Sequence, residues 1–68
     1  MKMYQLAVSC FLIKVRFDGA TWKAWVDHTS LSGHWETRAY TTKKRLVAWF
    51  QREFPSDVWQ PVETLLNS

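Results

Sequence analysis

The most informative segment of the chain is residues 11–26, which read FLIKVRFDGATWKAWV. Apolar and polar residues alternate on both sides of Asp18-Gly19. This dipeptide is typical of a two-residue turn between antiparallel strands, because both central positions of such a turn need positive φ. With a two-residue turn, Phe17 faces Ala20 and every pair on that side is apolar. We therefore predict a β-hairpin with one fully apolar face.

The opposite face of this hairpin is basic and aromatic. In the two-residue register it carries three cross-strand pairs: Arg16 with Thr21, Lys14 with Lys23, and Leu12 with Trp25. Like charges directly across strands are destabilising, so a negatively charged partner would relieve the two lysines. Trp25 offers a surface on which bases can stack. Alternatively, Trp25 and Leu12 lie beneath the N-terminal arm or the C-terminal segment, with lysine stems packed around them.

The segment before residue 11 changes the phase of the alternation. Its apolar residues Tyr4, Leu6 and Val8 occupy even positions, whereas the apolar residues from Phe11 onward occupy odd ones. A bulge or bend near Cys10-Phe11 would explain the change. The arm Tyr4–Ser9 is then expected to pair at a sheet edge, either within one chain or across a homodimer.

The rest of the chain predicts one more strand and two helical segments. Residues 28–33 suit a polar loop, and residues 34–40 a third strand with Trp35, Thr37 and Ala39 on one face. Thr41-Thr42 can cap a helix that Pro55 ends. The chain is thus one α+β domain, residues 1–68, with the sheet over 4–40, a helix over 42–54 and a short helical segment over 57–66, broken or restarted at Pro61. The antiparallel sheet has three strands, or four with the bent arm, and packs on the helix.

The amino-acid composition constrains the core, the location and the charge of the chain. The chain has 68 residues and a single cysteine, Cys10, so disulfides cannot supplement its thin core. A lone cysteine without a signal-peptide pattern predicts a cytoplasmic location, and no apolar stretch approaches the ~20 residues that span a bilayer. Residues 1–52 carry all 9 Lys and Arg residues, although the net charge is only +3.

No catalytic or cofactor site is predicted. Cys10 could act as a nucleophile with His28 or His34 as base, but a buried cysteine that serves as a small apolar residue is the stronger interpretation. The two histidines, with Asp27 and Glu36, match no zinc-binding spacing, and His28 falls on the apolar face, where backbone hydrogen bonds would satisfy it. There is no phosphate-binding or dinucleotide motif. We expect a binding protein without metal or cofactor, not an enzyme.

Three cations, Lys43, Lys44 and Arg45, begin the predicted helix. They oppose the helix dipole, which favours acidic residues at this end. Together with the unpaired amides of the first turn they would bind a phosphate. The alternative is an ordinary solvated helix start.

Residues 39–49, AYTTKKRLVAW, resemble the junction of third strand and helix in the arm-binding, AP2-like N-terminal domains of phage-type tyrosine integrases. Tyr40, Thr42 and Lys43 match the loose pattern of that family. Its glycine, glutamate and alanine are replaced here by Ala39, Arg45 and Leu46, and the element order agrees over roughly residues 11–54. The corresponding part of double-stranded-RNA-binding domains also has a Lys-Lys helix start, but their first helix is absent here.

The integrase resemblance implies a sheet that reads the DNA major groove, in a protein without a recombinase core. The leading prediction is a nucleic-acid-binding accessory protein of a phage or other mobile element. Its expected contact residues are Lys14, Arg16, Lys23, Trp25, Arg38, Lys43, Lys44 and Arg45. The alternatives are a protein-binding module, such as a small phage-encoded inhibitor of a host or defence complex, and a homo-oligomeric structural subunit paired through Tyr4–Ser9.

Overall fold

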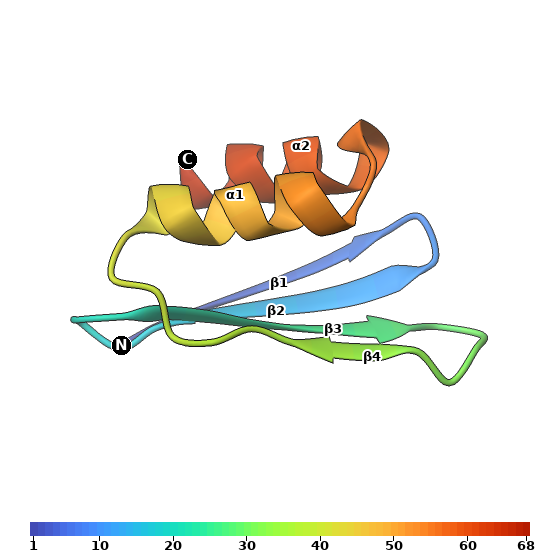
Figure 1. Cartoon of the computed structure of the whole chain (residues 1–68), viewed down its shortest axis with the longest axis horizontal. Coiled ribbons are helices and arrows are strands. Elements are labelled where there is room, and N and C mark those ends of the chain that lie inside the picture. The colour runs from blue at the N-terminus through green and yellow to red at the C-terminus, as the bar shows by residue number, and fades with distance from the viewer.

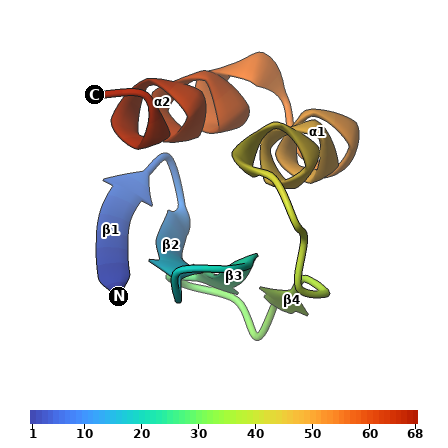
Figure 2. The same ribbon diagram turned by 90° about the vertical axis from the view of Figure 1, so that its left-hand side faces the viewer.

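The computed structural model describes the whole chain, residues 1–68, as four antiparallel strands followed by two helices. The elements are β1 (Lys2–Val8), β2 (Phe11–Phe17), β3 (Trp22–His28), β4 (His34–Glu36), α1 (Lys43–Glu53) and α2 (Ser56–Leu66). The strand order is β1-β2-β3-β4, so each strand pairs with its neighbour in sequence. Both helices lie on one face of the sheet, the inner face, and the outer face has no covering layer (Figure 1, Figure 2). The predicted α+β fold is confirmed.

The core lies between the inner face and the two helices. The sheet contributes Ile13, Val15, Ala24 and Val26, all buried. The helical layer contributes Leu46, Val47 and Phe50 from α1, Val58, Val62 and Leu66 from α2, and Phe54 between them. These positions recur every three or four residues in each helix and every second residue in each strand, so one apolar stripe of each element meets the others. Burial of each larger side chain contributes about 1.5–3 kcal/mol.

The connection between β2 and β3 differs from the predicted two-residue turn. Phe17 pairs with Trp22, so four residues, Asp18–Thr21, form the connection. The Asp18 carboxylate oxygen Oδ1 accepts the N–H groups of Ala20 at 2.9 Å and Thr21 at 2.7 Å, which stabilises the wider loop. Gly19 supplies the positive φ of 99°. The predicted register is therefore wrong by two residues, but an even shift keeps every side chain on its predicted face.

The phase change before Phe11 is a tight hairpin and not the predicted bulge. Val8 pairs with Phe11, which leaves Ser9 and Cys10 as a two-residue turn, with Ser9 at φ 55°. β1 thus pairs with β2 of the same chain and completes a four-stranded sheet. Cys10 is exposed at this turn, so its interpretation as a buried apolar residue is wrong.

The last strand is shorter than predicted. At Thr37 the backbone N–H still donates to the Ala24 carbonyl at 3.0 Å, but a side-chain hydroxyl replaces the backbone carbonyl as the acceptor for the Ala24 N–H. The Thr37 hydroxyl oxygen accepts the Ala24 N–H at 3.0 Å, and the hydroxyl donates to the Arg38 carbonyl at 2.8 Å. The chain rejoins the sheet only at a single bridge between Tyr40 and Trp22. As a result Ala39 is exposed instead of facing the core.

Both helices begin and end close to the predicted residues. The Thr42 hydroxyl caps α1 by accepting the Arg45 N–H at 3.1 Å, and Phe54 ends the helix. α2 is as long as α1, 11 residues, and continues through Pro61. The predicted helical segment over 57–66 is therefore confirmed, and only the predicted break or restart at Pro61 is wrong.

Candidate nucleic-acid interface

The outer face presents a basic and aromatic surface that no other part of the chain covers (Figure 1). Alternation along the strands and the strand registers place eleven side chains on it: Met3, Gln5, Ala7, Leu12, Lys14, Arg16, Lys23, Trp25, Asp27, His34 and Glu36. Leu12 is 51% exposed, and α2 packs on the opposite face, against the inner side of β1. The interpretation in which an arm or a helix covers Trp25 and Leu12 is therefore wrong.

Trp25 lies near the centre of this surface, between cations of two strands. The Arg16 guanidinium carbon is 5.3 Å and the Lys23 ammonium nitrogen 5.4 Å from the centroid of its ring. Both distances are in the range in which a cation is attracted to the negative face of an aromatic ring. Lys14 lies directly across from Trp25, and Arg16 across from Lys23. The predicted opposition of Lys14 and Lys23 is wrong, and the like charges that face each other are Arg16 and Lys23.

The charge of Lys23 is offset by a neighbouring carboxylate. Its ammonium nitrogen lies 2.7 Å from Glu36 Oε2. This hydrogen bond and the positive charge behind it hold the pKa of Glu36 below its ordinary value of 4.5. Lys14 and Arg16 form no ion pair, and Arg16 Nε is buried without a hydrogen-bond partner. The cations on this face that are not neutralised are therefore Lys14 and Arg16.

A shallow depression of about 320 Å³ adjoins Trp25 on the outer face. It is lined by Met3, Lys14, Trp25, Asp27 and His34. Asp27 Oδ1 and His34 Nδ1 are 2.6 Å apart, so this end of the depression holds a polar pair. One small surface thus combines an aromatic ring, a free cation and hydrogen-bonding groups, the features with which proteins hold single-stranded bases and their phosphates.

The second predicted basic group lies in a different layer of the molecule. Lys43, Lys44 and Arg45 begin α1, on the other side of the sheet from Trp25 (Figure 1). The Lys43 ammonium donates to the Leu66 carbonyl at 3.0 Å, at the end of α2, where a cation also complements the helix dipole. Lys44 and Arg45 are exposed. The structure therefore does not unite the helix start and the outer face in one surface, and it gives Lys43 a structural contact.

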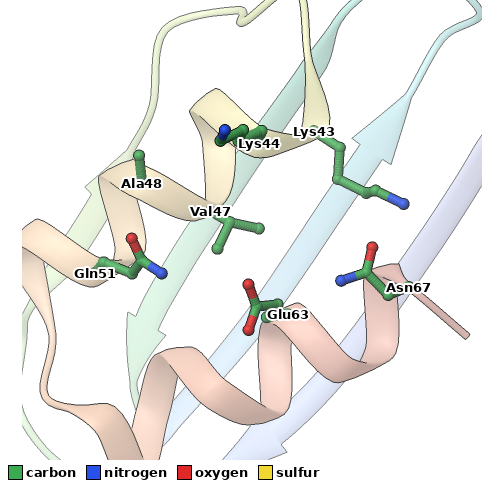
Figure 3. A pocket seen from close by; sticks show the side chains of 7 residues that line it. All are labelled: Lys43, Lys44, Val47, Ala48, Gln51, Glu63 and Asn67. Atoms are coloured by element: carbon green, nitrogen blue, oxygen red, sulfur yellow. The ribbon is translucent and has the colours of Figure 1, made fainter.

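A groove of about 370 Å³ separates α1 from α2 near this helix start (Figure 3). Its walls are Lys43, Lys44, Val47, Ala48, Gln51, Glu63 and Asn67. Glu63 projects into the groove from α2, opposite the side that carries the lysines (Figure 3). Because the groove combines a carboxylate with the two cations, it has no uniform positive charge for a phosphate chain.

Neither Arg38, a predicted contact residue, nor His28, a candidate base or metal ligand, lines the depression beside Trp25. Arg38 follows β4, and its guanidinium carbon lies 5.9 Å from the centroid of the Tyr40 ring. His28 lies on the inner face, as predicted, where its Nδ1 accepts the N–H groups of Ser30 and Leu31. His34 is on the outer face, so the two histidines are separated by the sheet, and no three potential metal ligands lie together.

Three residues of the depression were not among the predicted contact residues: Met3, Asp27 and His34. Met3 lines the same depression as Trp25 only because β1 pairs with β2 of the same chain. The sequence did not decide between this pairing and pairing with β1 of a second chain. Asp27 follows Trp25 by two residues, so strand alternation alone places it on the same face. The position of His34 depends on the length of the 28–33 loop, which alternation does not determine.

Comparison of the chain with protein-family models, with curated proteins and with solved structures finds no match. The resemblance to the integrase arm-binding domains therefore stays a prediction. None of the helices is both long and apolar enough to cross a membrane.

Proposed function

We propose that this chain binds single-stranded nucleic acid through its outer face, with bases stacked on Trp25 and phosphates held by Lys14 and Arg16. The proposal rests on one observation above all: Trp25 stands on an uncovered sheet face beside two cations that have no acidic partner. An aromatic ring on an open sheet binds any base by stacking, which contributes about 1–3 kcal/mol per base. The role is one of binding, in the cytoplasm, where the exposed free thiol of Cys10 would stay reduced.

The charge distribution favours a single strand over a duplex. Lys23 is paired with Glu36, and Lys43–Arg45 lie in the other layer. The outer face therefore offers two free cations, far fewer than the 6–10 phosphate contacts that make duplex binding strong and steeply salt-dependent. Two phosphate contacts to a single strand give a slope of log K against log salt of about −1.4. Stacking on Trp25 has to supply much of the remaining binding energy.

The test is a fluorescence-anisotropy titration of labelled single-stranded DNA, single-stranded RNA and duplex DNA at low and moderate salt. We expect the single strands to bind and Trp25→Ala to weaken binding by about 1–3 kcal/mol, which corresponds to roughly 5- to 160-fold. Trp25→Phe retains an aromatic ring and is expected to lose less. Circular dichroism verifies that both variants remain folded.

A matched pair of lysine variants separates the outer face from general electrostatic attraction. Lys14 is on the outer face, whereas Lys44 is exposed on α1. Lys14→Gln is expected to weaken binding and reduce its salt dependence, and Lys44→Gln to leave both unchanged. Equal losses in the two variants, or no binding of any strand at low salt, would rule out the proposed interface.

A second candidate function is protein binding through the same face. Met3 and Leu12 are 54% and 51% exposed, and methionine and aromatic residues are enriched in the cores of protein interfaces. The Lys23–Glu36 and His34–Asp27 pairs also reduce the net charge of the surface. A stoichiometric partner protein that survives nuclease treatment and is lost in Leu12→Lys would favour this function over nucleic-acid binding.

A further inference from the structure

We propose that two copies of this chain pair antiparallel through the free edge of β1, with Gln5 on the two-fold axis, and join their sheets into one. β1 is an edge strand of seven residues whose only neighbour is β2. The unpaired backbone groups of such an edge form a ready template for another strand. Pairing through this edge does not rest on the proposed nucleic-acid binding, although Met3 belongs both to β1 and to the depression beside Trp25.

The backbone groups that face the free edge can be identified from the hydrogen bonds on the other side of the sheet. Trp22 and Tyr40 each donate a backbone N–H to the carbonyl of the other, and the His28 N–H donates to the Gly33 carbonyl. The backbone N–H and C=O groups of the even-numbered residues of β3 therefore point toward β4. Backbone groups of an antiparallel strand point alternately to its two neighbours. When this alternation is carried through the two strand registers, the N–H and C=O groups left at the free edge belong to Met3, Gln5 and Ala7.

The side chains of these three residues allow the strand to pair with its own copy. They carry no charge, and β1 contains no proline and no charged residue after Lys2. With Gln5 opposite Gln5 of the partner subunit, Met3 lies opposite Ala7 of the partner subunit, and the two Lys2 side chains lie at opposite ends of the joined strands. Each of these opposed pairs can exchange two backbone hydrogen bonds, and no like charges meet.

The other edge of the sheet is unsuited to the same pairing. β4 has three residues, His34–Glu36, and two of them are polar or charged on the outer face. Directly after it, the Thr37 hydroxyl replaces one backbone acceptor of the ladder. Short, charged and irregular edges are how sheet proteins prevent edge-to-edge association. The two edges therefore differ, and only β1 lacks these features.

One apolar side chain of α2, Leu65, lies on the flank of the helix nearest the free edge of β1. Glu63 and Asn67 line the groove toward α1 (Figure 3), and Leu65 lies roughly half a helical turn away from both. Leu65 therefore points to the flank of α2 opposite α1, which is the side of β1's free edge (Figure 2). Leu65 is half-buried but does not belong to the core cluster. In the dimer, Leu65 of the partner subunit lies on the facing flank and would help to cover it.

Sedimentation equilibrium over micromolar to near-millimolar concentration tests the proposal. The wild type is expected to approach twice the chain mass of 8.1 kDa. Gln5→Lys places two lysines against each other on the axis and is expected to return the mass to that of one chain. Gln60→Lys, at an exposed position of α2 that faces away from the edge, is the matched control and is expected to remain dimeric.

Mixing two charge variants tests the register. Gln5→Lys and Gln5→Glu are each expected to be monomeric alone, and an equimolar mixture is expected to regain the dimer mass, because opposite charges then meet on the axis. Circular dichroism checks that each variant is folded. A wild type that stays at 8.1 kDa throughout, a dimeric Gln5→Lys, or a mixture that remains monomeric would overturn the proposal.

Discussion

Thr37 is the one polar residue that the fold buries, at 4% exposure, and its hydroxyl takes the place of a backbone carbonyl. The hydroxyl oxygen accepts the Ala24 N–H while the hydroxyl proton goes to the Arg38 carbonyl. A buried amide without an acceptor costs about 1–3 kcal/mol. Thr37 therefore allows the chain to leave the sheet after Glu36 without leaving the Ala24 amide unpaired.

Replacement of this hydroxyl by a methyl group should be costly despite the similar volume. We expect Thr37→Val to lower the free energy of unfolding by about 1–3 kcal/mol, because it leaves the Ala24 amide without an acceptor. Thr37→Ser keeps the hydroxyl and loses one methyl group, about 0.8 kcal/mol. Urea denaturation followed by circular dichroism measures both, and a valine variant as stable as the serine variant would contradict this role.

At the scale of the elements, the loop between β2 and β3 depends on the ionised side chain of Asp18. The backbone N–H groups of Thr21 and Ala20, which donate to the carboxylate, hold the pKa of Asp18 below its ordinary value of 3.8. A carboxyl group whose pKa is lower in the folded state than in the unfolded state stabilises the fold above the unfolded pKa. That contribution is lost as the pH falls through the folded pKa.

The expected result is a pH-dependent difference in stability between the wild type and Asp18→Ala. The wild type should unfold at the higher temperature when the pH is well above 3.8, and the difference should shrink as the pH falls below that value. Asp18→Asn keeps one acceptor oxygen without the charge and is expected to lie between the two. Thermal unfolding of all three proteins across this pH range is the measurement. A difference that stays constant down to the lowest pH would assign the effect to something other than this carboxylate.

The same loop explains which parts of the fold could be predicted. Alternation assigned Trp25 and Lys14 to the outer face correctly, since a shift of two residues leaves faces unchanged. It could not distinguish a two-residue turn from the four-residue loop that the Asp18 hydrogen bonds stabilise. The cross-strand partners on the candidate site were therefore wrong although the face was right.

Other errors have equally local causes. The Ser9-Cys10 turn has positive φ at a residue other than glycine or asparagine, so no turn signal marked it. The Lys43 contact with the Leu66 carbonyl joins residues from two helices, and no local pattern reveals it. Sequence periodicity describes which face a side chain occupies, whereas these features depend on how segments meet in space.

At the scale of the whole molecule, stability depends on few side chains. The core cluster has 11 residues, and a chain of this length is stable by only roughly 3–10 kcal/mol, at about 0.05–0.15 kcal/mol per residue. Phe50 is fully buried between the helices and the sheet. Its aromatic ring packs edge-on against Trp49, with the centroids 5.0 Å apart. A single core residue can therefore contribute a large share of the total free energy of unfolding.

We expect Phe50→Ala to cost about 3–5 kcal/mol, the usual range for removing a buried aromatic ring. This loss is a large part of the roughly 3–10 kcal/mol expected for the whole chain. Gln51→Ala, at the exposed neighbouring position, is the control and should change stability by less than about 0.5 kcal/mol. Urea titrations give both values. Near-wild-type stability of Phe50→Ala would mean that the core can close around the missing ring.

The order of the elements along the chain also has a consequence for synthesis on the ribosome. All four strands precede both helices, and every strand pairs only with its immediate neighbour. Such pairings close short loops and can form early. However, the apolar inner face of the sheet stays open to solvent until α1 and α2 have emerged. The nascent chain should therefore remain protease-sensitive and depend on chaperones until α2 has left the exit tunnel.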